Sequence, residues 1–344
     1  MNTMMNALVK TEKAPGLTLT QVPVPTCGDD EVLIKIRKTA ICGTDVHIYN
    51  WDDWSKRVIA PPIAVGHEYV GEVAAFGKNV TGLRLGQRVS GEGHIVCHQC
   101  RACRNGQIER CPNAKGVGVN RPGAFAEYLC IPAYNVMPVD ESIPEEIVSF
   151  FDAYGNATHT VLECDVVGED VLITGAGPIG IMAAAICRYA GARNVIITDL
   201  NDYRLDLAKK MGATAAVNVT RENLDEVARA HGVTDGFDVG LEMSGSIKAF
   251  NQMLKALRNG AHVAMLGLMN EEAIDWNDVI LKCITLKGIY GRKMDTWHKM
   301  PAMIQGGLDL APLITHRYNF REFEKGFEAM NSGLSGKVVL DWTE

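Results

Sequence analysis

The sequence predicts an α/β protein with a β-rich domain and a doubly wound parallel-sheet domain, and three observations lead to this fold class. Its 344 residues suggest two domains, at about 100–200 residues per domain. Short strand-like segments separated by glycine and proline fill residues 1–150. After them, apolar segments alternate with helical ones. We therefore expect the first domain at 1–150, rejoined by the tail 291–344, and the second at 151–290.

In the first domain, the expected strands are short and lie between turn residues. The segments 31–41, 68–77 and 87–93 are strand-like and bounded by glycine or proline. Many short strands with dense turn signals are typical of a barrel-like β domain. The strand-like segment 337–342 is assigned to the same domain.

In the second domain, the expected strands are apolar and alternate with helices. Buried strands are predicted at 236–245 and 261–268, and a third apolar run follows at 284–291. Helices are predicted over 202–213 and 247–260, each ending near a glycine. Buried apolar strands separated by helices indicate a parallel, doubly wound sheet.

Composition and charge exclude several classes of protein. Hydrophobic residues make up 47% of the chain and charged residues 22%, which is typical of a globular protein. The 34 basic residues are outnumbered by 41 acidic ones and form no basic run, so no nucleic-acid partner is expected. The most apolar helical stretch, 179–187, is much shorter than the roughly twenty residues that span a bilayer. The N-terminal segment lacks the apolar region of a secretory signal, so we expect a cytoplasmic protein with no membrane partner.

A glycine-rich turn in the second domain predicts a dinucleotide site. Gly175, Gly177 and Gly180 have the spacing G-x-G-x-x-G, and they follow the strand 171–174 and open a helix. The first glycine permits the tight turn, the second lets the backbone approach a pyrophosphate, and the third allows close helix–strand packing. We also expect cofactor contacts from Pro178 and Ile179 within this turn.

The end of the next strand indicates which dinucleotide is bound. Asp199 lies there, and an acidic side chain accepts hydrogen bonds from an adenosine ribose and repels a 2′-phosphate, so NAD is expected rather than NADP. Arg204 has two interpretations, as a group that accommodates a phosphate or as a contact to ribose or adenine. The alternative is a purely packing turn in which Asp199 caps a helix.

Four clustered cysteines predict a structural zinc site. Cys97, Cys100, Cys103 and Cys111 can surround one tetrahedral ion, and a site closed by four protein ligands is structural. The intervening residues are polar and provide little core of their own. Two disulfides or an iron–sulfur cluster are the alternatives, and a reducing compartment disfavours the disulfides. The remaining six cysteines are scattered along the chain.

Beyond these motifs, the chain resembles the zinc-containing medium-chain alcohol dehydrogenase family. GHEYVGEVAAFGKNV at 66–80 is similar to the family signature of G-H-E followed by spaced glycines. The order CGTDVH, GHE, four cysteines and GAGPIG covers nearly the whole chain. The resemblance implies a GroES-like catalytic domain with a structural zinc lobe at 97–111, and a Rossmann domain that binds NAD.

The resemblance also implies roles for individual residues. Cys42, His67 and Glu68 match the ligands of a second, catalytic zinc ion, with a fourth position open to water or substrate. Thr44 and His47 match a pair that relays the substrate proton to solvent. Two zinc ions per subunit are therefore expected.

Further residues are assigned to the same site or to the cofactor. Asp152 matches an acidic position near the metal, where it ligates zinc, acts through the proton relay or only caps a helix. His94 is either a substrate contact or a structural hydrogen-bonding residue. Additional NAD contacts are expected from Leu266, Gly267, Leu268, Ile289 and Tyr290.

The activity implied by the resemblance is the oxidation of a hydroxyl group by NAD. Stretches such as TAICGTDVHIYNWDDWS and GVGVNRPGAFAEYL are most similar to family members that oxidise the 3-hydroxyl of L-threonine to L-2-amino-3-oxobutanoate and assemble as homotetramers. The charged groups of L-threonine would need partners from Glu68, Asp152, His94 or Arg292. The alternatives are a sorbitol- or butanediol-type polyol dehydrogenase of the same family, or a zinc- and dinucleotide-binding protein without turnover.

Overall fold

The computed structural model describes residues 3–269 and 273–343 and divides the chain into two compact units. The first comprises Met1–Ala153, Lys293–Gln305 and Ile314–Glu344, and the second comprises Tyr154–Arg292 and Gly306–Leu313. The expected boundaries at 150 and 290 lie within a few residues of these divisions. The short segment Gly306–Leu313 differs from the expectation, because it groups with the second unit.

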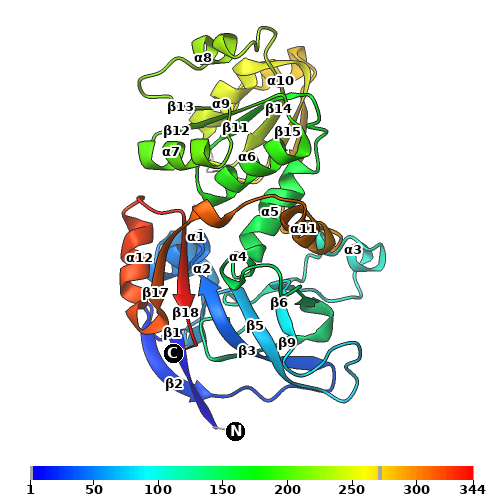
Figure 1. Ribbon diagram of the computed structural model, residues 1–344, viewed down its shortest axis with the longest axis vertical. Coiled ribbons are helices and arrows are strands. Elements are labelled where there is room, and N and C mark those ends of the chain that lie inside the picture. Colours follow the sequence, from blue (N-terminus) through cyan, green and yellow to red (C-terminus); the bar gives the residue numbers. More distant parts are fainter. Residues whose placement is uncertain (1–2, 270–272, 344) are drawn as a thin grey trace. The chain divides into compact units, whose positions relative to one another are not determined.

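The first unit is built on a seven-stranded sheet. Its strand order is β10-β6-β5-β3-β18-β17, and β9 pairs with β3. Most of its pairs are antiparallel, but β17 and β18 are parallel. Figure 1 shows β3, β5 and β18 side by side. The strands are β3 (Glu31–Ala40), β5 (Glu68–Phe76), β6 (Arg88–Gly91), β9 (Tyr128–Pro132), β10 (Val136–Pro138), β17 (Ile314–Asn319) and β18 (Lys337–Asp341).

Two smaller sheets and several short helices complete the first unit. Its helices include α1 (Gly43–Asn50) and α12 (Phe323–Asn331), which pack against each other through the stacked rings of Tyr49 and Phe327. Apolar side chains of β3, β5, β18 and α12 form one buried core. The other elements are β1 (Met4–Lys10), β2 (Thr18–Pro23), β4 (Ile63–Ala64), β7 (His94–Ile95), β8 (Lys115–Gly116), α2 (Asp53–Val58), α3 (Arg101–Arg104), α4 (Glu145–Val148) and α11 (Thr296–Gln305).

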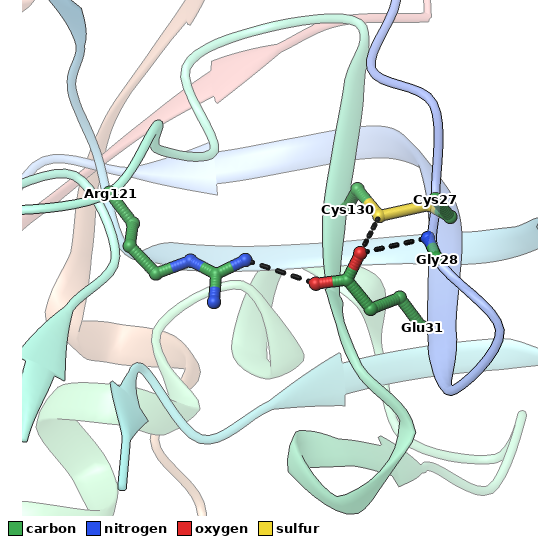
Figure 2. Close-up of a disulfide and its surroundings, with 5 residues drawn as sticks. All are labelled: Cys27, Gly28, Glu31, Arg121 and Cys130. Atoms are coloured by element: carbon green, nitrogen blue, oxygen red, sulfur yellow. Dashed lines mark hydrogen bonds and ion pairs between the residues drawn. A yellow bond between two sulfur atoms is a disulfide. The ribbon is translucent and has the colours of Figure 1, made fainter. Parts of the chain in front are cut away.

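A disulfide between Cys27 and Cys130 ties the segment before β3 to β9 (Figure 2). Beside it, the Glu31 carboxylate accepts a hydrogen bond from the Gly28 amide at 3.0 Å and lies 3.1 Å from the Arg121 guanidinium. The two cysteines are 103 residues apart, and nothing in their spacing indicates this pairing. The β3–β9 register, which places Leu33 opposite Cys130, brings the start of β3 next to the end of β9 that carries Cys130.

The second unit contains a six-stranded parallel sheet of order β13-β12-β11-β14-β15-β16. Figure 1 shows α6 and α7 along one face and α9 along the other, which is the doubly wound arrangement expected from the sequence. The helix α5 (Phe151–Val161) begins in the first unit and continues into the second. The other elements of the second unit are β11 (Asp170–Thr174), α6 (Pro178–Ala190), β12 (Asn194–Asp199), α7 (Asp202–Lys210), β13 (Ala215–Asn218), α8 (Leu224–Ala230), β14 (Phe237–Glu242), α9 (Ile247–Ala256), β15 (Leu257–Met265), α10 (Trp276–Leu281) and β16 (Thr285–Gly288).

The predicted helix over 247–260 is wrong for its last four residues. The helix α9 ends at Ala256, and β15 begins at Leu257, which is buried and pairs with Phe237 of β14. Gly260 has a positive φ of 75°, and its amide donates a hydrogen bond to the Lys282 carbonyl at 2.6 Å. Tertiary pairing therefore overrides the helical pattern at this point.

No helix within residues 3–269 and 273–343 is long and apolar enough to cross a membrane.

Candidate active site and metal centres

The loop between β3 and α1 presents the Cys42 thiol at the start of a helix. Cys42 has an extended backbone and is the N-cap of α1. Its amide donates a hydrogen bond to Asp45 Oδ2 at 2.9 Å, and Asp45 is completely buried. The Asp45 carboxylate therefore fixes the backbone of Cys42 within the first turn of the helix.

The strand register brings Cys42 to His67 and Glu68. Ala40 at the end of β3 pairs with Glu68 at the start of β5, so residues following β3 meet residues preceding β5. The thiol of Cys42, the imidazole of His67 and the carboxylate of Glu68 have donor atoms within 4.8 Å of one another. The three residues grouped in the sequence analysis thus form one cluster.

The polar atoms of this cluster fit a bound cation. Glu68 Oε1 and His67 Nδ1 are buried and have no hydrogen-bond partner among the described residues. Buried polar atoms without partners cost free energy unless an ion or a water satisfies them. A thiolate, an imidazole and a carboxylate are zinc ligands, and three protein ligands leave a fourth position free. The residues therefore fit a catalytic zinc ion.

The charges around the cluster shift the pKa values of two of its members. Burial lowers the pKa of His67, but the Asp45 carboxylate and the Cys42 thiol outweigh burial and raise it. Burial raises the pKa of Glu68, and the ammonium group of Lys337 opposes this rise. Lys337 is itself buried and contacts Glu68 Oε2.

The four clustered cysteines form a second, separate group of donors. Cys97, Cys100, Cys103 and Cys111 have sulfur atoms within 4.8 Å of one another. Cys100 caps α3 by accepting the Cys103 amide at 3.5 Å, and the Asn113 side chain donates to Cys97 at 3.6 Å. Among the residues that the structure describes, the buried side chains of this small cluster are Val96, Ile108 and Cys111. Four sulfur donors fit a closed zinc site that replaces a larger core.

The thiols of this cluster differ in acidity. The amide groups of Gln99, Asn113 and Cys100 lower the pKa of Cys97 to about 6. Burial and the neighbouring thiols of Cys100 and Cys111 raise the pKa of Cys103 to about 12. Because zinc is bound by thiolates, Cys97 provides a sulfur that is already ionised at neutral pH.

Asp152 and His94 lie in the first unit, but neither belongs to the three-residue donor group. Asp152 is the second residue of α5 and is 6% exposed. A Cβ atom at Gly93 would lie 3.4 Å from Asp152 Oδ1 and 3.8 Å from His67, which places the strand of His94 beside both residues.

The ring of His94 is held by a carboxylate that the sequence analysis did not include. Glu92 is 2% exposed, and its Oε1 lies 2.7 Å from His94 Nδ1 and accepts the His94 amide at 2.9 Å. The other oxygen of Glu92 accepts a hydrogen bond from Trp297 at 3.1 Å. The sequence GEGH carries the signal for this pair, because only Gly93 separates Glu92 from His94.

Thr44 and His47 both lie on α1, three residues apart, and so share one side of the helix. His47 contacts Asp52 through Nδ1, rather than Thr44. Its side chain is 59% exposed, whereas Thr44 is half-buried, so His47 is the solvent-side member of the pair. Asp52 also caps α2 by accepting the Ser55 amide at 2.9 Å.

The glycine-rich turn has the geometry that each glycine was expected to provide. Gly175 has a positive φ of 91°, as a tight turn requires. A Cβ atom on Gly177 would meet nothing within 4 Å, so the backbone is open to a ligand there. A Cβ atom on Gly180 would lie 2.0 Å from the Gly175 carbonyl, so only glycine permits this packing. The helix α6 begins at Pro178 and is followed by Ile179. This turn fits a pyrophosphate.

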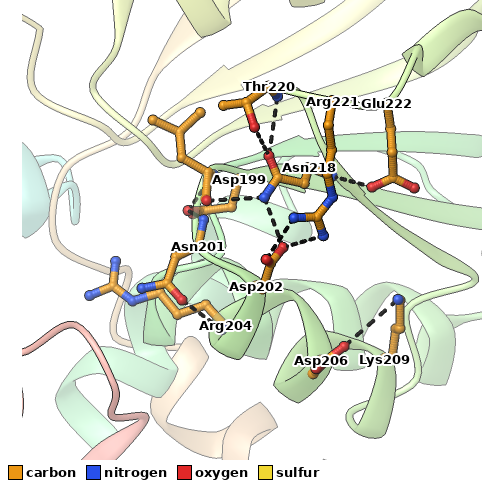
Figure 3. A network of polar contacts seen from close by, with 11 residues as sticks. Asp199, Asn201, Asp202, Arg204, Asp206, Lys209, Asn218, Thr220, Arg221 and Glu222 are labelled. Atoms are coloured by element: carbon orange, nitrogen blue, oxygen red, sulfur yellow. Dashed lines mark hydrogen bonds and ion pairs between the residues drawn. The ribbon is translucent and has the colours of Figure 1, made fainter.

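Asp199 lies at the end of β12 and is hydrogen bonded to the glycine turn. Its Oδ2 accepts the Ala176 amide at 2.6 Å, and its Oδ1 accepts the amides of Leu200 and Asn201 at 2.7 and 2.9 Å. Arg204 on α7 lies close by in Figure 3, and its buried Nε has no hydrogen-bond partner among the residues that are described. Asp199 therefore lies beside the turn, and Arg204 lies on the helix that follows it.

A polar network supports this strand end (Figure 3). Arg221 forms two contacts with Asp202, at 2.7 and 2.6 Å. The Asn218 side chain donates to Asp202 at 2.8 Å and to the Leu200 carbonyl at 3.1 Å. The network connects β13 to the loop that follows Asp199 and so fixes the position of that loop.

The remaining predicted cofactor contacts lie at the same edge of the sheet. Residues 266–268 follow β15, and residues 289–290 follow β16, so both segments lie at carboxyl ends of parallel strands. Ligands of open parallel sheets bind at this edge. Leu268 and Tyr290 are exposed at 85% and 63%, whereas Ile289 is buried. The other two predicted contacts in these segments are Leu266 and Gly267, whose amides donate to the Glu242 carbonyl.

The sequence analysis also missed one residue whose partner is distant, Lys337, and one whose partner is local, Asp45. Lys337 and Glu68 are 269 residues apart, and only the β18–β3–β5 order brings them together. Asp45 had a local signal, because it follows Cys42 by three residues at a helix start. Arg292, predicted as a substrate partner, is 1% exposed and groups with the second unit.

Known families match both units of the chain. The family described as alcohol dehydrogenase GroES-like domain matches residues 28–141, and the family described as zinc-binding dehydrogenase matches residues 178–306. The chain belongs to the zinc-containing medium-chain dehydrogenase family, and the predicted fold class is confirmed. A similar protein from Proteus mirabilis (strain HI4320), named L-threonine 3-dehydrogenase, is 60% identical over 340 residues, which cover 98% of this chain and 100% of the relative.

Solved structures of dehydrogenases have the same fold. The alcohol dehydrogenase TADH from Thermus sp. ATN1 is 26% identical with a TM-score of 0.90, covering 98% of this chain and 99% of that one. An alcohol dehydrogenase from Escherichia coli CFT073 in complex with NADH has a TM-score of 0.90 at 23% identity, covering 99% of this chain and 100% of that one. The second match, at its low identity, shows the shared fold.

Proposed function

We propose that this protein is an enzyme that oxidises the 3-hydroxyl group of L-threonine to L-2-amino-3-oxobutanoate and reduces NAD to NADH. The observation that carries the proposal is the cluster of Cys42, His67 and Glu68, which provides three zinc ligands and leaves one position free. The relatives that match the whole chain at about 60% identity, such as that of Proteus mirabilis, are named for the same reaction.

In this proposal, Cys42, His67 and Glu68 hold the catalytic zinc ion. When bound there, zinc supplies Lewis-acid chemistry, which lowers the pKa of a hydroxyl group at the fourth position. The hydroxyl proton passes to the Thr44 hydroxyl and then to His47, which is exposed and releases it to solvent. Asp52 holds His47 through Nδ1 and so leaves Nε2 to accept the proton.

The second unit supplies the oxidant. NAD bound there would take up the hydride from the carbon atom that carries the hydroxyl group, so the products would be the 3-oxo acid, NADH and one proton. The turn of Gly175, Gly177 and Gly180 would receive the pyrophosphate, and Asp199 would bind the adenosine ribose. A 2′-phosphate would be repelled by Asp199, which supports NAD over NADP.

The charged groups of L-threonine need partners in the first unit. Asp152 is a carboxylate close to His67, and we propose that it binds the ammonium group or acts beside the metal. His94 is half-buried, and Glu92 and Trp297 fix its ring orientation. We propose that His94 contacts the amino acid and that Glu92 is its positioning residue.

We further propose that the protein is a cytoplasmic homotetramer. The strand β16 is the edge of the parallel sheet, and α10, which precedes it in the chain, exposes Trp276, Ile280 and Leu281. An edge strand and a helix with exposed apolar side chains are surfaces that a second copy would cover. In the cytoplasm, thiols are kept reduced, so Cys27 and Cys130 would be a thiol pair there.

A substrate panel tests the proposed activity. NADH or NADPH formation is measured by absorbance with L-threonine, L-serine, sorbitol and 2,3-butanediol, each with NAD and with NADP. The proposal expects the highest kcat/KM for L-threonine with NAD. A preference for a polyol would assign the alternative reaction to the same zinc and dinucleotide sites. Zinc content at two ions per chain without turnover of any alcohol would contradict the enzyme assignment.

A further inference from the structure

Lys337 is a lysine that the fold buries almost completely, with 2% of its surface exposed. It begins β18, and the residues that follow it, 338–340, are buried and hydrophobic. Taking an ammonium group out of water costs free energy that only well-placed partners recover. The partners of Lys337 therefore indicate why a charged residue occupies this position.

Those partners belong to three segments that carry candidate site residues. Lys337 Nζ donates to Glu68 Oε2 and to the Ile41 carbonyl at 3.1 Å. It also lies 5.9 Å from the ring centre of Phe150. Ile41 directly precedes Cys42, and Phe150 precedes Asp152 by two residues. One ammonium group thus lies at three of the segments that carry candidate site residues.

The sheet register makes this arrangement rigid. The Ile41 amide donates to the Val338 carbonyl at 2.9 Å, and Val339 pairs with Ala40. Ala40 also pairs with Glu68 on the opposite side of β3. Backbone hydrogen bonds on both sides of β3 therefore determine where Lys337 meets Glu68.

The two carboxylate oxygens of Glu68 consequently differ. Oε2 is occupied by Lys337, whereas Oε1 is buried and lacks a hydrogen-bond partner in the part of the chain that the structure describes. Since Oε2 is occupied, Oε1 is the oxygen left to bind a cation together with Cys42 and His67.

We propose that Lys337 is a positioning residue of the catalytic zinc site, which holds Glu68 by Oε2 so that Oε1 ligates the metal. Its positive charge also offsets the negative charges of the Cys42 thiolate and the Glu68 carboxylate. A less negative site stabilises the charge that develops on a substrate oxygen. The inference rests on the proposed function in one respect, which is that zinc occupies this cluster.

The test compares three variants of the full-length, zinc-loaded protein. Lys337→Met removes the charge, Lys337→Arg keeps it, and Lys10→Met is the matched control. Lys10 is also completely buried and donates to the carbonyls of Ala14 and Gly16, but it touches no candidate zinc ligand. The affinity of each zinc ion is measured by competition with a chromogenic chelator, and the visible absorption spectrum is recorded after Co²⁺ substitution.

We expect Lys337→Met to bind one of the two zinc ions about 10–100-fold more weakly, as is typical when a residue that orients a metal ligand is removed. We expect Lys337→Arg to restore most of this affinity and Lys10→Met to leave it unchanged. The cobalt spectrum of the weakened site should change in Lys337→Met, whereas that of the four-cysteine site should not. If Lys337→Met does not fold, Lys337→Gln takes its place.

A folded Lys337→Met protein with wild-type zinc affinity and an unchanged cobalt spectrum would overturn the inference. An equal loss of zinc affinity in Lys10→Met would also overturn it, because the effect would then reflect general destabilisation. Failure of the proposed function is seen separately, in a wild-type protein that binds only one zinc ion or does not oxidise L-threonine.

Discussion

The two proposed metal centres of this protein differ in how the chain builds their donor groups. Four sulfur donors from residues 97–111 make up one, and each of its members lies within a single polar lobe. The other takes its donors from Cys42, His67 and Glu68, in two segments, and is held by Lys337 from a third. On the proposed assignment, the first centre has four protein ligands and the second has three.

The difference shows that chain topology, as well as ligand number, determines whether a metal site is closed by protein ligands or keeps one position open. A lobe with almost no hydrophobic core needs its metal in order to fold, so all four positions are taken by the chain. A centre between strands β3, β5 and β18 is held by the sheet and does not need a fourth ligand for stability. That free position can take part in chemistry.

The largest effect should come from removing a ligand of the open centre. We expect Cys42→Ser to lower kcat by about 1000-fold, because the loss of Lewis-acid stabilisation is worth several kcal/mol, and each tenfold change corresponds to about 1.4 kcal/mol. NAD binding, measured by isothermal titration calorimetry, should not change. If a Cys42→Ser protein that lacks the zinc ion of the open centre turned over substrate at the wild-type rate, the open centre would have no catalytic role, and the proposed difference between the two centres would be wrong.

Removing a ligand of the closed centre should mainly affect stability. We expect Cys100→Ser to lower the melting temperature by about 5–10 °C, which corresponds to about 2–3 kcal/mol for a unit of this size. The measurement is differential scanning calorimetry, with kcat determined below the transition. Cys283→Ser is the matched control, because Cys283 is exposed and outside both clusters. An unchanged melting temperature would argue against a structural zinc ion.

The two zinc ions should also leave in a definite order. Three protein ligands and an open position let a chelator form a ternary complex, whereas four buried or half-buried sulfurs do not. During dialysis against 1,10-phenanthroline, we expect activity to fall in step with the first zinc ion, and the melting temperature to fall with the second. Zinc analysis of timed samples makes this measurement. Simultaneous loss of both ions would contradict the comparison.

The smallest effect concerns the titratable pair beside the open centre. Burial raises the pKa of Asp52, but the Ser55 amide and His47 outweigh it and hold the pKa below its ordinary value of 3.8. The stability that the ionised Asp52 contributes is therefore present above pH 4 and is lost as the pH falls through the lower, folded-state pKa.

Two variants separate the charge of Asp52 from its capping role. We expect Asp52→Ala to cost about 1 kcal/mol of unfolding free energy at pH 7, since it removes the cap of α2. Asp52→Asn keeps a capping side chain and should cost less than that. Urea unfolding between pH 3 and pH 7 measures both, and the cost of Asp52→Asn should decrease towards the acid end of this range. A cost that does not depend on pH would show that the Asp52 charge plays no part.

The sequence predicted the parts of the fold that depend on local patterns. The glycine turn at 175–180, the acidic residue ending β12 and the four-cysteine spacing each carry their chemistry within a short segment. The grouping of Cys42 with His67 and Glu68 came instead from the resemblance to a family, because no spacing joins them. The register between Ala40 and Glu68 is the physical cause of that grouping, and it is a tertiary property.

The features that could not be predicted depend on pairing between distant strands. The end of α9 at Ala256 depends on the burial of Leu257 against β14, and the Cys27–Cys130 disulfide depends on the β3–β9 register. From the sequence, Lys337 is an ordinary charged residue at the start of a strand. Its role is visible only once β18 is placed beside β3. In each case the outcome depends on a neighbouring strand that is distant in the sequence, and not on the local sequence alone.

The position of β18 in chain order has a consequence for synthesis. This strand pairs with β3 inside the sheet of the first unit, yet it follows the whole second unit along the chain. A ribosome must therefore translate the second unit before the first can close its sheet. The four-cysteine lobe can take up its metal while the chain is still being made, whereas the centre at Cys42 is completed only after Lys337 has emerged.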